Sequence, residues 1–540
     1  ADFNAGQYSS RNAAFQSAIT RVSGRKQPGA MEALREALSG DAETDGELGA
    51  AVDFLVGAGR RAADDAAVPT SLLASLRPYQ ERGFRWMLGN FDRGLGCLLA
   101  DDMGLGKTVQ TIAAALALKE SGRLGGGALV CAPASLLTNW ERELSRFAPG
   151  LSVCVYYGSS RKLRRGGAAA DVTLSSYETW LRDQNKHADA VWSLVVLDEA
   201  HYIKNPDSRR AKAVKAIKAE RRLALTGTPV ENNLSELWSV FDFALPGYLG
   251  TLARFTSEFR KPIELDRSAD AADRLRRATA PFILRRLKTD EAVAADLPDK
   301  IVVDEYAALT PEQAALYEAI ASEGLSRVRS AGREDRLGLV LALITALKQA
   351  SNHPRNYDKE SPGSSDRSGK SRLLVALLES AFESGERVLV FSQYVEMLDI
   401  LAGVVRDELG VEPFVLHGRM SKKRRDAAVD GFQAGRGPGV FLVSLKAGGV
   451  GLNLTAATRV VHYDLWFNPA VENQATDRAY RIGQGRNVFV HRLITRDTIE
   501  ERIDAMIASK RELSELTVRS GESWIADMGD DELRELVALR

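Results

Sequence analysis

Short apolar runs alternate with amphipathic stretches along most of the chain after residue 76. In the first half these runs begin at positions 95, 128, 153, 193 and 223, and segments with helical spacing separate them. This alternation of strand and helix is typical of a parallel β-sheet that is covered by helices.

The alternation stops near Phe241 and resumes more than a hundred residues later. The intervening stretch is charged and helical in pattern, with a helix-like segment from 337, and a polar Gly/Ser-rich segment from Lys359 predicts a flexible boundary. A second series of apolar runs begins at 387, 439, 459 and 487, and a long helix is expected from Asp497.

These patterns predict an α/β protein with two parallel-sheet lobes, helical insertions between them and a C-terminal bracing helix. The expected divisions are a flanking region without assigned function (1–70), a first lobe (71–245), helical protrusions and a linker (246–365), a second lobe (366–500) and a helical brace (501–540).

The amino-acid composition is typical of an ordinary globular protein. The net charge does not favour binding to a polyanion such as nucleic acid. Lys plus Arg equals Asp plus Glu at 72 each, so any nucleic-acid surface must be local. No apolar run approaches the roughly 20 residues that cross a bilayer, and the first residues lack a secretory signal. We expect a cytoplasmic protein, associated with the nucleoid in a bacterium or nuclear in a eukaryote. The polar start without Met predicts that further domains flank this chain.

A glycine-containing turn in the first lobe has the features of a phosphate-binding loop. The segment LLADDMGLGKT ends at Thr108 and lies between an apolar run and an amphipathic stretch. Backbone N–H groups around Gly104 and Gly106 are expected to hold phosphate oxygens. Lys107 would neutralise these oxygens, and the Thr108 hydroxyl would bind magnesium. Asp101 stands where the general pattern has its first glycine. An ordinary glycine-rich turn is the alternative.

An acidic pair follows another apolar run of the same lobe. The segment SLVVLDEAH places Asp198 and Glu199 at a predicted strand end, where open α/β sheets present ligand-binding residues. Asp198 is expected to hold magnesium, directly or through water. Glu199 is expected to orient and deprotonate the water that attacks in phosphoryl transfer. A solvated acidic pair is the alternative, and the phosphate loop nearby argues against it.

The second lobe has no phosphate loop, but it carries two candidate catalytic arginines. Arg478 and Arg481 would share one face if the segment QATDRAYRIGQ is helical. An arginine from a neighbouring lobe stabilises charge on a transferred phosphoryl group and makes hydrolysis depend on closure. A solvated basic helix face is the alternative.

In their order along the chain, these segments resemble the Swi/Snf-type ATPases of helicase superfamily two, with a bacterial or archaeal-like member expected. The match runs from about Leu76 to Ile503 and includes LRPYQ, ADDMGLGKT, APASLLTNW, LDEAH, LTGTP, PFILRRLKTD, LKQASNHP, LVFSQY, LHGRMS, SLKAGGVGLNLTAA and QATDRAYRIGQ. The resemblance implies two RecA-like lobes, ATP and magnesium as cofactors, and ATP-driven tracking along double-stranded DNA. It also implies that Gln80 reads adenine and that Gly451 lies at the nucleotide.

The same resemblance implies contacts with DNA at motif positions. They fall at Ser135, Asn139, Trp140, Ser175, Tyr177, His417, Arg419, Ser444, Lys446, Gly448 and Phe467. Such contacts in the family are mainly to backbone phosphate, so we expect salt-sensitive binding that is largely independent of sequence. Phe467 stands where the family usually has Trp, which puts that contact in doubt. Basic clusters at 161–165, 209–218 and 422–425 favour DNA binding, although each alone is also typical of a solvated face.

The sequence therefore predicts a DNA-dependent ATPase that translocates on duplex DNA and remodels or displaces bound proteins. A strand-separating helicase is an alternative, since its ATP site would look nearly the same. An ATP-regulated DNA- or polymerase-binding scaffold is another, but it would need neither a general base nor arginine fingers. We expect a monomer without membrane contact, whose partners are duplex DNA and a DNA-bound protein such as RNA polymerase.

Overall fold

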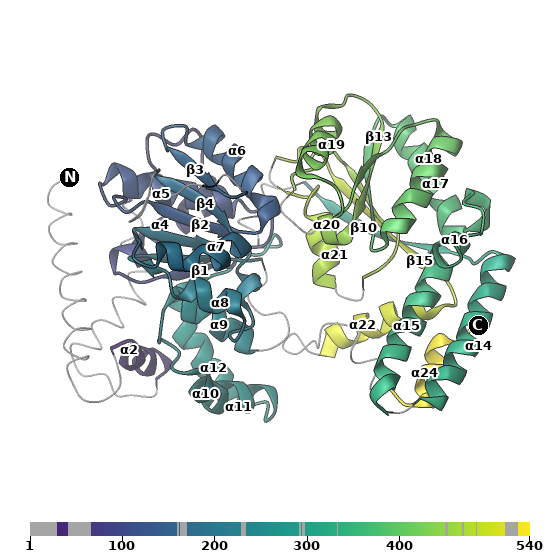
Figure 1. Cartoon of the computed structure of the whole chain (residues 1–540), viewed down its shortest axis with the longest axis horizontal. Coiled ribbons are helices and arrows are strands. Elements are labelled where there is room, and N and C mark those ends of the chain that lie inside the picture. Colours follow the sequence, from purple (N-terminus) through teal and green to yellow (C-terminus); the bar gives the residue numbers. More distant parts are fainter. Residues whose placement is uncertain are drawn as a thin grey trace. The chain divides into compact units, whose positions relative to one another are not determined.

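The protein is described here from a computed structural model, which divides into one unit at Ala1–Ala295 and a second at Asp296–Arg540 (Figure 1). Each unit is considered by itself. The structure describes residues 30–40, 66–158, 161, 170–227, 234–290, 293, 298–331, 333–448, 452–466, 469–481, 483–513 and 528–539.

Unit 1 is built on a seven-stranded parallel sheet with strand order β3-β4-β2-β6-β8-β1-β9. Its strands are β1 (Cys97–Leu99), β2 (Ala128–Ala132), β3 (Val153–Tyr156), β4 (Val172–Ser176), β6 (Leu194–Leu197), β8 (Arg222–Leu225) and β9 (Ile283–Leu284). A separate pair joins β5 (Val191–Trp192) to β7 (Lys218–Ala219). The five strands expected in this lobe are therefore confirmed.

Helices cover both faces of this sheet. They are α4 (Pro78–Asp92), α5 (Lys107–Glu120), α6 (Leu137–Phe147), α7 (Tyr177–Asp183), α8 (Arg209–Lys215) and α9 (Leu234–Ala244). Alternate strand residues such as Leu98, Leu129 and Val195 pack with α7, α8 and α9. Their neighbours Leu99 and Val130 point to the other face and are equally buried, so neither face meets solvent.

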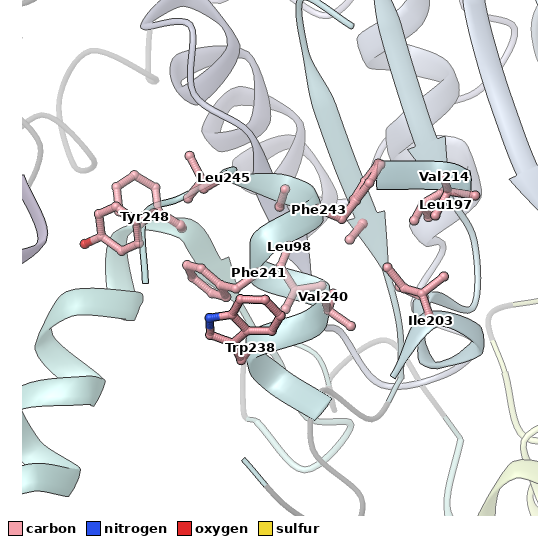
Figure 2. Packing of buried hydrophobic residues seen from close by; sticks show 14 of the residues in the cluster. Leu98, Leu197, Ile203, Val214, Trp238, Val240, Phe241, Phe243, Leu245 and Tyr248 are labelled. Atoms are coloured by element: carbon pink, nitrogen blue, oxygen red, sulfur yellow. The ribbon is translucent and has the colours of Figure 1, made fainter. Parts of the chain in front are cut away.

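The aromatic residues of α9 are buried in this core. Figure 2 shows Trp238, Phe241 and Phe243 packed beside Leu98 and Leu197 of the sheet. Full burial of such side chains stabilises a fold by about 2–3 kcal/mol each. A helical extension packs below this core, formed by α10 (Leu252–Phe255), α11 (Lys261–Glu264) and α12 (Ala269–Thr279).

Part of the N-terminal flanking region belongs to unit 1. Helix α2 (Ala30–Ser39) buries Leu34 and Leu38 against this extension. The Arg35 Nη1 atom lies 2.8 Å from Glu258 Oε2, which ties α2 to the turn after α10.

Unit 2 contains a six-stranded parallel sheet with strand order β10-β15-β14-β11-β13-β12. The strands are β10 (Lys300–Ala307), β11 (Arg387–Ser392), β12 (Phe414–Leu416), β13 (Gly439–Ser444), β14 (Arg459–His462) and β15 (Val488–Thr495). Helices α17 (Gly369–Glu383) and α18 (Val395–Leu409) cover one face. Helices α19 (Lys422–Ala434) and α21 (Pro469–Thr476) cover the other. Short helices α16 (Pro354–Tyr357) and α20 (Leu445–Gly448) connect these elements.

A helical bundle extends from one end of the second sheet (Figure 1). It combines α14 (Pro311–Ser330) and α15 (Arg333–Asn352) with α22 (Ile499–Leu513) and α24 (Asp530–Val537) around a common apolar core. The expected C-terminal helix is therefore present, and it packs on helices from the middle of the chain. No helix among the described residues is long and apolar enough to cross a membrane.

The linker between the lobes differs from the expectation in one respect. Residues 246–365 contribute β9 to the first sheet and β10 to the second, and the units divide after Ala295. The polar segment from Lys359 lies inside unit 2, where Ser368 and Lys370 are fully buried. Composition suggested a flexible boundary, but Ser368 and Lys370 of this polar segment have partners elsewhere in unit 2, at Asn352 and Glu500.

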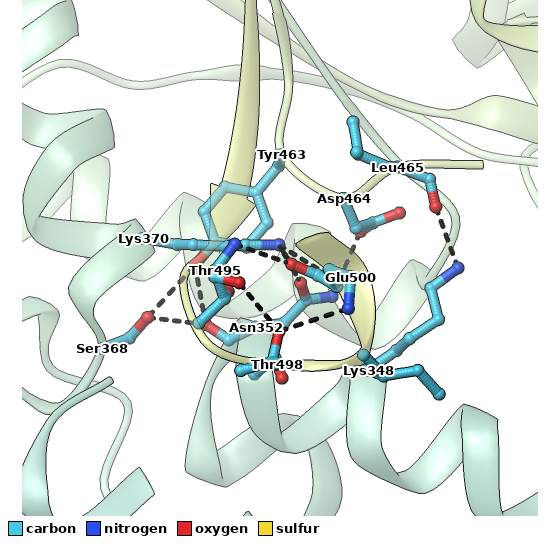
Figure 3. Close-up of polar contacts among 12 residues, drawn as sticks. Lys348, Asn352, Ser368, Lys370, Tyr463, Asp464, Leu465, Thr495, Thr498 and Glu500 are labelled. Atoms are coloured by element: carbon cyan, nitrogen blue, oxygen red, sulfur yellow. Dashed lines mark hydrogen bonds and ion pairs between the residues drawn. The ribbon is translucent and has the colours of Figure 1, made fainter. Parts of the chain in front are cut away.

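Figure 3 shows this buried polar cluster in unit 2. Lys370 Nζ lies 2.7 Å from Glu500 Oε2 and donates to Asn352 Oδ1 over 3.2 Å. Asn352 Nδ2 in turn donates to Asp464 Oδ2, and Lys348 Nζ donates to the carbonyl of Leu465. The cluster fastens α15 and α22 to the carboxyl end of the sheet.

Candidate functional site

The loop between β1 and α5 has the backbone geometry of an anion cradle. Gly104 and Gly106 have φ angles of +82° and +78°, in the left-handed region that favours glycine. A Cβ atom on Gly106 would also lie 2.3 Å from Gln80 Nε2. Helix α5 begins at Lys107, so the N–H groups of its first turn lack acceptors within the helix and are suited to bind an anion.

Polar side chains predicted for nucleotide binding gather at this loop. Lys107 Nζ donates to the carbonyl oxygens of Asp101 and Asp102 over 2.6 and 3.2 Å. Gln80 Nε2 donates to the Leu105 carbonyl over 3.1 Å. The structure therefore brings together Gln80, Gly104, Gly106, Lys107 and Thr108, while Gly451 lies outside the described residues.

Asp198 lies directly after β6, at the same carboxyl edge of the sheet. Its Oδ2 atom accepts a 2.8 Å hydrogen bond from Trp140 Nε1, and its Oδ1 atom accepts one of 2.9 Å from the Glu199 N–H. Burial, and then the neighbouring Glu199 charge, raise the pKa of Asp198 to about 6, while the positive charge of Lys107 acts in the opposite direction. A cation at this position would favour the ionised carboxylate.

Glu199 has a backbone conformation that few side chains adopt. Its φ angle is +52°, which for a non-glycine residue is disfavoured by roughly 1 kcal/mol. The Oε2 atom of Glu199 lies 3.3 Å from His201 Nδ1. Such local strain is concentrated at functional sites, because the surrounding structure must hold it in place.

The oxygen ligands at this edge fit a magnesium ion that is bound together with phosphate. Among the described residues, no group of three or more His, Cys, Asp or Glu side chains is arranged to hold a metal. Magnesium commonly takes one or two protein ligands and completes its shell with water and phosphate oxygens. Asp198 and the half-buried Thr108 supply that limited set.

Three of the DNA contacts expected in unit 1 need correction. Trp140, Ser175 and Tyr177 are buried, with at most 1% of each residue exposed. Trp140 donates to the Asp198 carboxylate, and the Tyr177 hydroxyl donates to the Asp198 carbonyl over 2.8 Å. In this structure Trp140 and Tyr177 support the acidic motif from within, because the motif pattern fixes position along the chain and not the direction of the side chain.

Two other expected contacts of unit 1 remain accessible. Ser135 is exposed in a short helical turn, and Asn139 is half-buried with its Nδ2 atom 2.9 Å from Glu143 Oε1. Both therefore stay candidates for phosphate contact.

Two of the expected contacts in unit 2, His417 and Arg419, lie at an open hollow. It has a volume of about 790 Å³, and His417, Arg419, Arg406 and Arg424 are among the residues that line it. The Arg419 side chain is 76% exposed and lies 3.6 Å from Glu396. This hollow concentrates groups that suit a phosphate backbone.

Helix α19 begins at this hollow with four basic residues, 422–425. Positive side chains are unfavourable at a helix N-terminus, where the macrodipole is positive. Among the residues that the structure describes, Lys422, Lys423 and Arg424 form no ion pair. A bound anion would relieve this excess positive charge.

The basic cluster on and around α8 is different. Arg210 lies 2.8 Å from Glu178, Lys215 lies 3.0 Å from Asp242, and acidic partners also lie within 4.0 Å of Lys212 and Lys218. In the first cluster, Arg161 pairs with Asp183, while 162–165 fall outside the described residues. Among the described residues of these three clusters, the start of α19 has the largest unpaired positive charge.

The remaining expected contacts of unit 2 divide into buried and undescribed positions. Ser444 is 2% exposed, so its side chain is not presented to DNA in this structure. Lys446 and Gly448 lie in α20, and Phe467 lies outside the described residues. The neighbouring Trp466 is half-buried, and its backbone N–H donates to Glu472 Oε1 over 2.7 Å.

Arg478 and Arg481 do not share a helix. Helix α21 ends at Thr476, and the chain then turns. Arg478 is 4% exposed, and Arg481 Nη1 donates to the Leu452 carbonyl over 3.3 Å. The helix on which a shared face depended ends before this pair, and the Leu454 N–H donates to the Arg478 carbonyl over 2.9 Å where the chain turns.

Sequence reasoning missed one residue at the nucleotide loop. Arg286 binds the buried carboxylate of Asp101, which is the residue that departs from the usual loop pattern. The missing glycine and the motif PFILRRLKTD, which contains Arg286, were separate signals, and the 185 positions between the two residues concealed their pairing.

Comparisons with known proteins agree with these features. The family model of the SNF2-related domain matches residues 79–356, and that of the helicase conserved C-terminal domain matches 369–483. A third model, described as a protein of unknown function, matches 1–46.

Similar proteins come from bacteria, archaea and eukaryotes. YwqA of Bacillus subtilis, whose name describes a candidate ATP-dependent helicase/translocase, is 44% identical over 87% of this chain and 52% of its own length. The human SWI/SNF-related regulator of chromatin, subfamily A member 1, is 36% identical over 83% of this chain and 44% of its own. The chain thus spans about half the length of these relatives. A solved structure of the Sulfolobus solfataricus SWI2/SNF2 ATPase core with dsDNA is 42% identical, covers 87% of this chain and 99% of its own, and has a TM-score of 0.45.

Proposed function

Since this chain belongs to the SNF2-related domain family, we propose that it is a DNA-dependent ATPase that translocates on double-stranded DNA and thereby displaces or remodels bound proteins. One observation carries the proposal. The glycine loop, Lys107 and the acidic pair of Asp198 and the strained Glu199 meet at the carboxyl edge of one parallel sheet. That arrangement provides both a phosphate cradle and a candidate base.

The residues of unit 1 divide the work of ATP hydrolysis among them. The loop N–H groups and Lys107 would bind the phosphates, and Lys107 would exchange its loop carbonyl partners for phosphate oxygens. Glu199 would accept the proton of the attacking water, with its carboxylate oriented beside His201. Asp198 and Thr108 would hold magnesium, which when bound neutralises charge on the phosphate oxygens.

Unit 2 would contribute arginine to the reaction and a surface to DNA. We propose that Arg478 and Arg481 stabilise charge on the transferred phosphoryl group during ATP hydrolysis. The hollow at His417 and Arg419, together with the start of α19, would bind backbone phosphate. Binding of that kind positions the protein without reading sequence.

The proposal is tested by ATP turnover in the absence of nucleic acid and with duplex DNA, single-stranded DNA and RNA. Strong stimulation by duplex DNA is the expected result. Preference for single strands would support a strand-separating helicase instead. Nucleotide binding without turnover on any of these substrates would contradict the proposed activity of this chain.

Glu199→Gln tests the assigned base. Loss of a general base slows a reaction by about 10²–10⁴-fold, while the neutral amide leaves the phosphate loop intact. We therefore expect turnover to fall by that factor with ATP affinity and DNA affinity nearly unchanged. Turnover at the wild-type rate would remove Glu199 from this role.

A further inference from the structure

Arg286 connects four elements around the nucleotide loop. It follows the edge strand β9, and its Nε atom donates to Asp101 Oδ1 over 2.8 Å while Nη2 contacts Asp101 Oδ2. The Nη2 atom also donates to Gln110 Oε1 of α5 over 2.8 Å. The Nη1 atom donates to the Tyr79 carbonyl of α4, and the guanidinium lies 5.1 Å from the centre of the Tyr79 ring.

Asp101 contacts both Arg286 and the loop lysine, Lys107. The Asp101 residue is completely buried, and burial of a carboxylate is costly unless a cation pairs with it. The main-chain carbonyl of Asp101 accepts the 2.6 Å hydrogen bond from Lys107 Nζ. Arg286 therefore fixes the residue that holds Lys107.

Backbone hydrogen bonds join the same two segments. The Ala100 N–H donates to the Leu284 carbonyl over 2.7 Å, and the Asp102 N–H donates to the Arg286 carbonyl over 3.0 Å. The Lys288 N–H donates to Asp102 Oδ2 over 3.0 Å. Residues 100–102 thus have little freedom to move apart from 284–288.

Helix α4 is built to approach this cluster closely. A Cβ atom on Gly83 would lie 2.1 Å from Gln110 Oε1 and 2.7 Å from Arg286 Nη2. Gly83 lies one turn after Gln80, whose amide contacts the loop. The four hydrogen bonds of the Arg286 side chain and its contact with the Tyr79 ring therefore set the positions of both the loop and α4.

We propose that Arg286 is a positioning residue for the ATP site and that nucleotide binding is coupled through it to the segment 283–288. This inference rests on the proposed ATPase function. The segment 283–288 would therefore respond to the occupant of the loop. Coupling is reciprocal: whatever loosens 283–288 also weakens nucleotide binding. Asp101 replaces the usual glycine because it anchors Arg286.

The first test compares Arg286→Met with Arg285→Met in a Glu199→Gln background. Arg285 is the exposed neighbour and serves as a matched control. We expect Arg286→Met to weaken the binding of a fluorescent ATP analogue by about tenfold and Arg285→Met to leave it unchanged. In the Glu199 enzyme, Arg286→Met should raise KM more than it lowers kcat. Equal affinities in the two variants would overturn the proposal.

A second variant separates positioning from a purely structural role. Arg286→Met alone leaves a buried charge on Asp101, whereas Asp101→Asn combined with Arg286→Met removes both charges and should recover thermal stability. We expect this double variant to keep the weak nucleotide affinity. Wild-type stability together with wild-type affinity would show that the pair is structural only and would refute the inference.

Hydrogen exchange of the wild-type chain completes the test. Bound ATP analogue should slow amide exchange in 283–288, and this response should be lost in the double variant. A wild-type chain that binds ATP without hydrolysing it would contradict the proposed function but leave this coupling measurable. A wild-type chain that binds ATP with unchanged exchange in 283–288 would contradict the coupling alone.

Discussion

The two sheets use the same edge in different ways. In unit 1 the carboxyl edge carries Asp101, two residues after β1, and Asp198, directly after β6, and the Asp101 carbonyl accepts a hydrogen bond from the loop residue Lys107. In unit 2 the corresponding carboxyl edge carries Ser392 and Asp464, and Asp464 is bound by Ser392, Gln393 and Asn352. One edge is thus arranged for a ligand and the other for attachment of a helical bundle.

This difference explains what each buried ion pair does. The pair of Asp101 and Arg286 lies beside the loop lysine, so a change there is expected to reach the nucleotide. The pair of Lys370 and Glu500 lies under α15 and α22, where it links helices to the sheet. Substitution in these two buried ion pairs is therefore expected to have different effects, because different residues surround each pair.

Lys370→Met should have the largest effect on unit 2. Both members of the pair are fully buried, and loss of one leaves an uncompensated charge that costs about 3–5 kcal/mol of unfolding free energy. Denaturant unfolding of the full chain measures this change. Lys370→Met combined with Glu500→Leu should recover most of it. ATP affinity should stay at the wild-type value, and a loss comparable to that of Arg286→Met would break the comparison.

Glu472→Gln should alter the pH dependence of stability. Burial raises the pKa of Glu472 from 4.5 to about 7, so the folded state holds a proton that the unfolded state releases between these values. This group therefore lowers the unfolding free energy by roughly 3 kcal/mol as the pH rises from 4.5 to 7. In the glutamine variant, thermal unfolding measured between pH 4.5 and 7 should no longer show this decrease in stability with rising pH. An unchanged slope would show that Glu472 is already ionised in the fold.

The smallest effect is expected at the start of α19. Replacing Lys422, Lys423 and Arg424 with Ser should weaken duplex binding and reduce the slope of log affinity against log salt by up to about 3. The matched control replaces Arg210, Lys212 and Lys215, which have acidic partners. A larger loss of duplex affinity in the control variant would indicate that the DNA-binding surface lies on unit 1.

Much of the fold follows from the sequence, but the supporting residues of the site do not. Apolar runs predicted strands such as β1, β2 and β11, and the loop and acidic motif were predicted from residues close together in the chain. Strand β9 has two residues, and β10 is mostly exposed, so neither carries a clear apolar pattern.

The directions of side chains and their pairing across long stretches of sequence also could not be predicted from the sequence. Trp140 was expected at DNA but donates to Asp198, 58 positions away. Arg286 pairs with Asp101 across 185 positions. Such contacts depend on how the sheet brings strand ends together, which periodicity along the chain does not encode.

Displacement of a third strand from triplex DNA tests the central claim most directly. The substrate is a duplex that carries a bound third strand and no free ends for strand separation, and Glu199→Gln is the control. ATP-dependent release of the third strand by the wild-type chain, with an intact duplex and no release by the control, is the predicted result. Duplex-stimulated ATP hydrolysis without release of the third strand would contradict translocation.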